Sequence, residues 1–69
     1  MGSTLPKLSA LRTIRESQFL TQEELAELAG VTRVTVSRIE QQSLEPRFST
    51  IKKLARALKV QPAELVGES

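Results

Sequence analysis

The chain contains no cysteine, no histidine and no aspartate among its 69 residues. Without cysteine it cannot build a disulfide framework, which favours a cytoplasmic setting. The three missing residue types also supply most metal ligands and most proton-transferring side chains in enzymes. We therefore expect no metal, no cofactor and no catalytic residue, and we expect that the protein is not an enzyme.

Long apolar runs are absent as well. No stretch approaches the roughly 18 apolar residues of a membrane span, and no signal-peptide pattern opens the chain. With 39% hydrophobic and 26% charged residues, the composition is that of one small globular domain. We expect this domain to occupy residues 6–66, with residues 1–5 a disordered tail or tag remnant and residues 67–69 a C-terminal tail.

The net charge of +2 conceals an uneven distribution. Residues 1–29 carry three cations and four glutamates, whereas residues 30–59 carry seven cations and two glutamates. The basic central segment favours a polyanionic partner. An ordinary solvated surface remains the alternative for Lys52, Lys53 and Arg56.

Hydrophobic spacing predicts an all-α domain of five helices. The first covers about residues 6–18, the second 22–29 and the third 33–41. A stripe from Phe48 to Leu58 predicts a fourth helix, and Pro62 opens a short fifth one. Thr21 with Glu24 forms a capping-box sequence, and Thr32 is the expected N-cap of the third helix. Between the first two helices, we expect Phe19 and Leu20 to fill the core.

The segment TQEELAELAGVTRVTVSRIE, residues 21–40, is the most informative part of the chain. Gly30 lies where the second helix must end, because glycine tolerates the left-handed conformation of a tight turn. Ala26 lies where the two helices must approach closely. The apolar residues of the segment are spaced to meet in one core: Leu25, Ala29, Val31, Val36 and Ile39.

The third helix carries further side chains that are not part of this core. They are cationic, hydrogen-bonding and lightly apolar, which suits a helix lying in a DNA major groove: Arg33, Val34, Ser37, Arg38 and Gln41. The pattern resembles the Cro/repressor-type helix-turn-helix family, which includes phage Cro and repressor domains and the xenobiotic-response-element-type bacterial regulators. The likeness extends from about Leu8 to Val66. It implies a compact lambda-repressor-like domain, encoded by a bacterium or a phage, whose second and third helices form the helix-turn-helix.

Four residues are the candidate base contacts. Arg33 can reach guanine O6 and N7 bidentately, or it can clamp a phosphate. Val34 is a β-branched residue at a solvent-facing helix position, where it lowers helix propensity but could contact a thymine methyl group. Ser37 and Arg38 lie one turn further on and complete the patch.

A second set of residues is expected to contact the DNA backbone. In the resembling repressors, the residue matching Gln22 caps the second helix and donates to a phosphate. The segment Pro46-Arg47-Phe48 also matches them, and there the aromatic packs inward while its neighbours face the DNA backbone. The full set of expected backbone contacts is Gln22, Thr32, Thr35, Gln41, Ser43 and Arg47.

Arg15 falls on the buried side of its helix, and Glu40 falls at the border of the buried side of the third helix, beside Val36. A lone charge would be costly there, so we expect the two to pair. The resemblance implies the same, because the phage repressors join an Arg and a Glu at the matching positions. Two separately solvated charges remain the alternative.

The loop after the third helix departs from the family pattern. The family usually has a glycine there, whereas this chain has Gln41-Gln42-Ser43. We expect one of these residues to adopt a positive φ, at an energetic cost.

Two function classes follow from these observations. The first is sequence-specific binding of a double-stranded DNA operator by a transcriptional regulator, a repressor or a controller-type protein. The second is an antitoxin or another protein-interaction module of the same fold. The chain has no room for a ligand-sensing domain, so we expect no small-molecule ligand within it. One short helix covers few base pairs, so we expect a homodimer on DNA. We expect this dimer to be weak, because the core needs most of the apolar residues that an interface could use. Its candidate interface residues are Leu58, Val60, Leu65 and Val66, with Leu44 as a second possibility.

Overall fold

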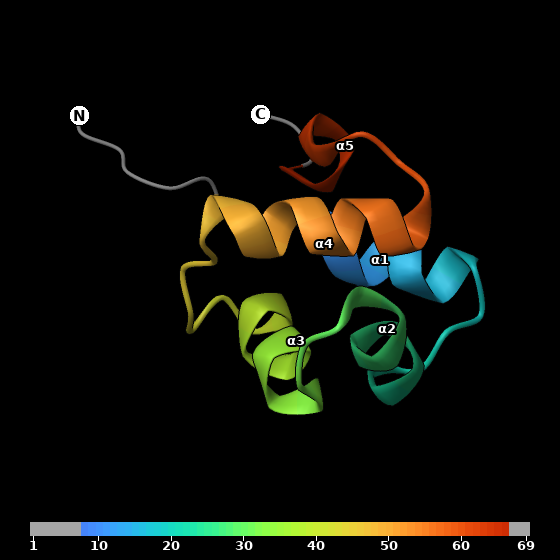
Figure 1. Cartoon of the computed structure of the whole chain (residues 1–69), viewed down its shortest axis with the longest axis horizontal. Helices are drawn as coiled ribbons and strands as arrows, with labels where there is room; N and C mark the ends of the chain where they lie inside the picture. Colours follow the sequence, from blue (N-terminus) through green and yellow to red (C-terminus); the bar gives the residue numbers. More distant parts are fainter. Residues whose placement is uncertain (1–7, 67–69) are drawn as a thin grey trace.

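The computed structural model describes residues 8–66, which form five α-helices and no strand. Figure 1 shows α4 crossing the molecule, with α5 on one side of it, α2 and α3 on the other, and α1 behind. The predicted all-α architecture is confirmed, while both predicted tails lie outside the described residues. The helices are α1 (Leu11–Ser17), α2 (Gln22–Ala29), α3 (Arg33–Glu40), α4 (Phe48–Leu58) and α5 (Pro62–Val66).

The core lies between α4 and the other helices. Every apolar residue predicted to join α2 to α3 is buried there, except Val31, which packs against its edge. Ala26 is buried where the two helices approach, as expected from its small side chain. The buried apolar residues are Leu8, Leu11, Leu25, Ala26, Ala29, Val36, Ile39, Ile51, Leu54, Ala55, Leu58 and Leu65.

The first helix begins later than predicted. Leu8, Ser9 and Ala10 are not helical, and the helix starts at Leu11. The Ala10 amide donates to the Leu65 carbonyl at 3.0 Å, and the Leu11 amide donates to the Leu8 carbonyl at 3.1 Å. This contact with α5 holds the chain in a turn before α1, and the spacing of apolar residues carries no information about it.

The prediction that both phenylalanines point inward is wrong. Phe19 is 92% exposed and Phe48 is 64% exposed. Phe19 has a φ of 60°, which turns its side chain outward after the end of α1, and Leu20 packs against the core instead. Phe48 is the first residue of α4, almost a full turn before the first buried residue of that helix, so it lies at the margin of the core.

The predicted helix ends around the turn are confirmed. Thr21 Oγ1 accepts from the Glu24 amide at 3.0 Å, and the Glu24 carboxylate accepts from the Thr21 amide at 2.9 Å. Gly30 closes α2 with a φ of 76°. Helix α3 ends one residue before the predicted limit, and Gln42 beyond it has a φ of 61°. The expected positive φ in this loop is therefore confirmed.

The Arg15–Glu40 pair is confirmed and lies inside the fold. Arg15 Nε donates to Glu40 Oε2 at 2.6 Å, and Arg15 Nη2 donates to Glu40 Oε1 at 3.1 Å. The two side chains are 9% and 4% exposed. Arg15 Nη1 also donates to the Leu20 carbonyl at 2.7 Å. The hydrogen bond to Glu40 raises the pKa of Arg15 above its usual value, so the guanidinium stays charged.

We predict that Glu40→Ala destabilises the domain by about 3–5 kcal/mol, because it leaves the Arg15 guanidinium buried without its partner. The double variant R15M/E40L should recover much of this loss, since apolar side chains replace both charges. Urea unfolding of the three proteins, followed by circular dichroism, measures the difference. Wild-type stability of the single variant would contradict the prediction.

Candidate nucleic-acid interface

Helix α3 has one side in the core and the other toward solvent. Burial of Val36 and Ile39 fixes its rotation. Arg33, Val34 and Arg38 are consequently exposed, with Val34 at 48%. The structure thus brings three of the four predicted base contacts onto one open surface, and half-buried Ser37 lies within the same helix.

The cations of this surface have no acidic partner among the residues that the structure describes. Within residues 8–66, neither Arg33 nor Arg38 forms a salt bridge, whereas Arg12 and Arg15 do. Glu40, the acidic residue of α3, is occupied by Arg15. The outer side of α3 therefore presents free positive charge, as expected of a surface that meets a polyanion.

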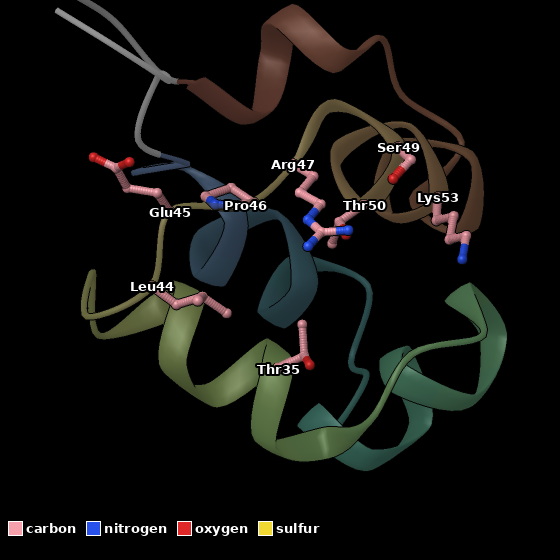
Figure 2. Close-up of a pocket in the computed structure, with 8 residues that line it drawn as sticks. All are labelled: Thr35, Leu44, Glu45, Pro46, Arg47, Ser49, Thr50 and Lys53. Carbon is pink, nitrogen blue, oxygen red and sulfur yellow. The ribbon is translucent and has the colours of Figure 1, made fainter.

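A cleft of about 340 Å³ lies between α3 and the beginning of α4. Figure 2 shows the side chains of Arg47 and Lys53 beside this cleft, with Thr35 across from them on α3, while Glu45 points away. Eight residues line it: Thr35, Leu44, Glu45, Pro46, Arg47, Ser49, Thr50 and Lys53.

The first turn of α4 adds polar groups to this cleft. Arg47 is the N-cap residue, but its side chain makes no cap hydrogen bond. The amides of a helix N-terminus carry partial positive charge and bind phosphate readily. Together with the hydroxyls of Ser49 and Thr50 and the cationic side chains of Arg47 and Lys53, these amides make the cleft suitable for one phosphate group of a nucleic-acid backbone.

Several of the predicted backbone contacts already have partners inside the domain. Thr32 Oγ1 accepts from the Thr35 amide at 3.1 Å and lies 2.9 Å from Thr35 Oγ1, which confirms it as the N-cap of α3. The Ser43 amide and hydroxyl both approach the Arg38 carbonyl, at 2.9 and 3.3 Å. Gln41 Nε2 lies 3.4 Å from Ser37 Oγ. Thr32 therefore caps the beginning of α3, and Ser43 satisfies a carbonyl near its end.

Gln22 differs from the expectation in one respect. Thr21 caps α2, and the Gln22 side chain instead turns toward Glu40, with Nε2 donating to Oε1 at 3.0 Å. Gln22 is half-buried, so it still reaches the surface at the beginning of α2.

Sequence reasoning missed Ser49 and Thr50, and it left Lys53 between two interpretations. On a helical wheel, these three residues fall on one side of α4, so the signal was present in their spacing. Lys52 and Arg56 belong to a different groove, which Ala55, Val60 and Pro62 also line. The three basic residues of α4 therefore do not form one surface.

No described helix is long and apolar enough to cross a membrane. Residues 8–66 also contain no group of three or more acidic, histidine or cysteine side chains that could hold a metal ion. The outer side of α3 and the adjoining cleft are characterised by their shape, their cations and their hydrogen-bonding groups.

A sequence model of the Helix-turn-helix family matches residues 11–65, and the chain belongs to this family. The immunity repressor protein of Bacillus phage phi105 is 38% identical over 58 residues, which are 84% of this chain and 40% of that protein. The HTH-type transcriptional regulator PuuR of Escherichia coli (strain K12) is 38% identical over 58 residues, 84% of this chain and 31% of that protein. The chain thus spans less than half the length of both relatives, which are regulators and not enzymes.

Solved structures with the same fold confirm the expected lambda-repressor-like architecture. The restriction-modification controller protein C.AhdI from Aeromonas hydrophila matches with a TM-score of 0.81 and 38% identity, over 86% of this chain and 91% of that one. The P22 c2 repressor, solved in complex with a synthetic operator, matches with a TM-score of 0.81 and 25% identity, over 97% and 100% of the two chains.

The exposed residues of α3 and the residues of the cleft are predicted to have different roles, the first reading bases and the second holding the DNA backbone. We predict that Arg33→Ala and Val34→Ala change the preference at particular base pairs, by about 1–3 kcal/mol for a lost bidentate contact. Arg47→Ala, in the cleft, should weaken binding to all duplexes alike. Selection from random duplexes followed by sequencing measures both effects. An unchanged sequence preference of Arg33→Ala would show that α3 docks in another orientation.

Proposed function

We propose that this chain binds double-stranded DNA sequence-specifically and regulates transcription, as a repressor or a controller-type protein in the cytoplasm of a bacterial cell. The observation that carries the proposal is the exposed side of α3, next to a cationic cleft. There Arg33 and Arg38 lie around Val34 and form no salt bridge with any residue from 8 to 66. The operator complex of the P22 c2 repressor, which has the same fold, supports it.

In this proposal, α3 lies in the major groove and the cleft receives the backbone at its edge. Arg33, Val34, Ser37 and Arg38 face the bases. Arg47 and Lys53 neutralise phosphates, and the first-turn amides of α4 donate to one of them. The major groove is wide enough for one helix, and its edge pattern distinguishes all four base pairs. These roles are compatible with the packing of α3, because the residues on its inner side, Val36 and Ile39, are buried in the core.

We predict specific binding that depends strongly on salt, because neutralised phosphates release counterions. The logarithm of the association constant should fall with the logarithm of salt concentration, by a slope of about 0.9 per phosphate contacted. Titration of a selected duplex and a scrambled duplex at several salt concentrations measures this slope. Equal affinity for both duplexes, or no binding at low salt, would refute the proposal.

We further propose a weak homodimer that assembles on DNA. One domain covers too few base pairs to be selective against a genome, whereas a two-fold pair reads two half-sites about 34 Å apart. Two of the residues expected at its interface cannot serve, because Leu58 and Leu65 are fully buried in the core. Val60 and Val66 remain half-buried, and Leu44 is 39% exposed but lines the cleft beside α3. Val60 and Val66 are therefore the better candidates.

Because Val60 and Val66 are only partly exposed, they offer an interface little apolar surface. We therefore predict that the free protein is largely monomeric at micromolar concentration. On a selected duplex it should bind as two copies, and the selected sequences should be near-palindromic. Sedimentation of the free protein and a stoichiometry titration on DNA measure the two states. One copy per site with an asymmetric sequence would exclude the dimer.

A further inference from the structure

One carboxylate joins the buried pair to the surface proposed to meet DNA. Glu40 Oε1 accepts from Arg15 Nη2 at 3.1 Å and from Gln22 Nε2 at 3.0 Å, while Oε2 accepts from Arg15 Nε at 2.6 Å. Glu40 is thus the shared partner of a residue in the core and a residue at the beginning of α2. The Glu40 side chain is 4% exposed, so these bonds form away from solvent.

The charge of Glu40 decides which way the Gln22 amide faces. An ionised carboxylate can only accept hydrogen bonds, so Gln22 must present its nitrogen, and not its oxygen, to Glu40. One of the two Nε2 hydrogens is used in this bond. The second hydrogen remains available on the same nitrogen, and a phosphate oxygen is also only an acceptor. The orientation that satisfies Glu40 is therefore the orientation that can donate to a DNA backbone.

The position of Glu40 is itself fixed. Two nitrogens of the Arg15 guanidinium hold both of its oxygens, and the third nitrogen donates to the Leu20 carbonyl at 2.7 Å. The planar guanidinium thus sets the carboxylate relative to the connection that leads into α2. Gln22 is the first residue after that connection and its N-cap, so its side chain starts from an anchored backbone.

We propose that Glu40 is a positioning residue for DNA binding, which holds the Gln22 amide ready to donate to a backbone phosphate before the DNA arrives. A free glutamine side chain must lose rotamer freedom when it makes such a contact, whereas one already held loses less. This inference rests on the proposed function. It gives the Arg15–Glu40 pair a role in affinity that is separate from its role in stability.

The test compares four proteins: wild type, Gln22→Ala, R15M/E40L and the triple variant. Dissociation constants are measured on one selected duplex, at a temperature where unfolding curves show all four to be folded. In the wild-type background, Gln22→Ala should weaken binding roughly tenfold, as for a lost hydrogen bond to a charged group. In the R15M/E40L background, binding should already be weaker, and Gln22→Ala should change it less than about twofold.

Arg47→Ala is the matched control, because Arg47 is also proposed to contact the backbone but makes no bond to Glu40. Its effect should be the same in both backgrounds. Equal effects of Gln22→Ala in both backgrounds would overturn the inference, and so would no effect of Gln22→Ala on the wild type. If the wild type does not prefer the selected duplex, the proposed function fails as well. If it does prefer that duplex but Gln22→Ala has equal effects in both backgrounds, only the inference about Glu40 fails.

A second measurement keeps the inference testable if R15M/E40L does not fold. In wild-type protein, one Nε2 hydrogen of Gln22 should exchange with water more slowly than those of Gln61, an exposed glutamine in the same chain. Nitrogen-15 spectra of the side-chain amides report this exchange. Equal exchange at the two residues would mean that Glu40 does not hold Gln22.

Discussion

The structure depends on the ion pair between Arg15 and Glu40. Burying a charge in a small domain is costly. The cost is offset here because the three guanidinium nitrogens of Arg15 and both carboxylate oxygens of Glu40 form hydrogen bonds. The Arg15 guanidinium binds the carboxylate of α3 and the carbonyl that precedes α2, at 2.6 and 2.7 Å. Apolar contacts could hold the same helices together, but they are not directional. The pair fixes the orientation of α3 and the start of α2 relative to α1.

The polar residues of the helix-turn-helix divide into two groups. Those at the helix ends, such as Thr32 and Ser43, bond to the backbone of α3 and hold it in shape. Those along its outer side, Arg33 and Arg38, form no salt bridge within the described residues. The bonds of the first group hold the ends of α3 in shape, and the proposed reading of base edges requires side chains in fixed positions. Gln22, the first residue of α2, combines the two properties: its side chain bonds inward to Glu40, and it also reaches the surface.

Prediction from the sequence succeeded where the signal is local. The ends of α2 and the start of α3 follow from Thr21, Glu24, Gly30 and Thr32, because each cap involves residues within four positions of one another. The solvent-exposed side of α3, with Arg33, Val34 and Arg38, also followed from helical spacing. The direction of Phe19 did not, because a φ of 60° at a non-glycine residue reverses the expected side-chain direction. Nothing in residues 18–20 of the sequence signals that conformation.

The sequence by itself determined the number and order of the helices, the turn at Gly30, the aliphatic residues of the core and the outer side of α3. These features depend on spacing and capping, which act within one or two turns. Tertiary structure alone decided the late start of α1, which a hydrogen bond to Leu65 sets from the far end of the chain. It also decided that Thr35 and Lys53 share a cleft, and that Gln22 meets Glu40. Such contacts join residues distant in sequence, so only the packing of the helices can bring them together.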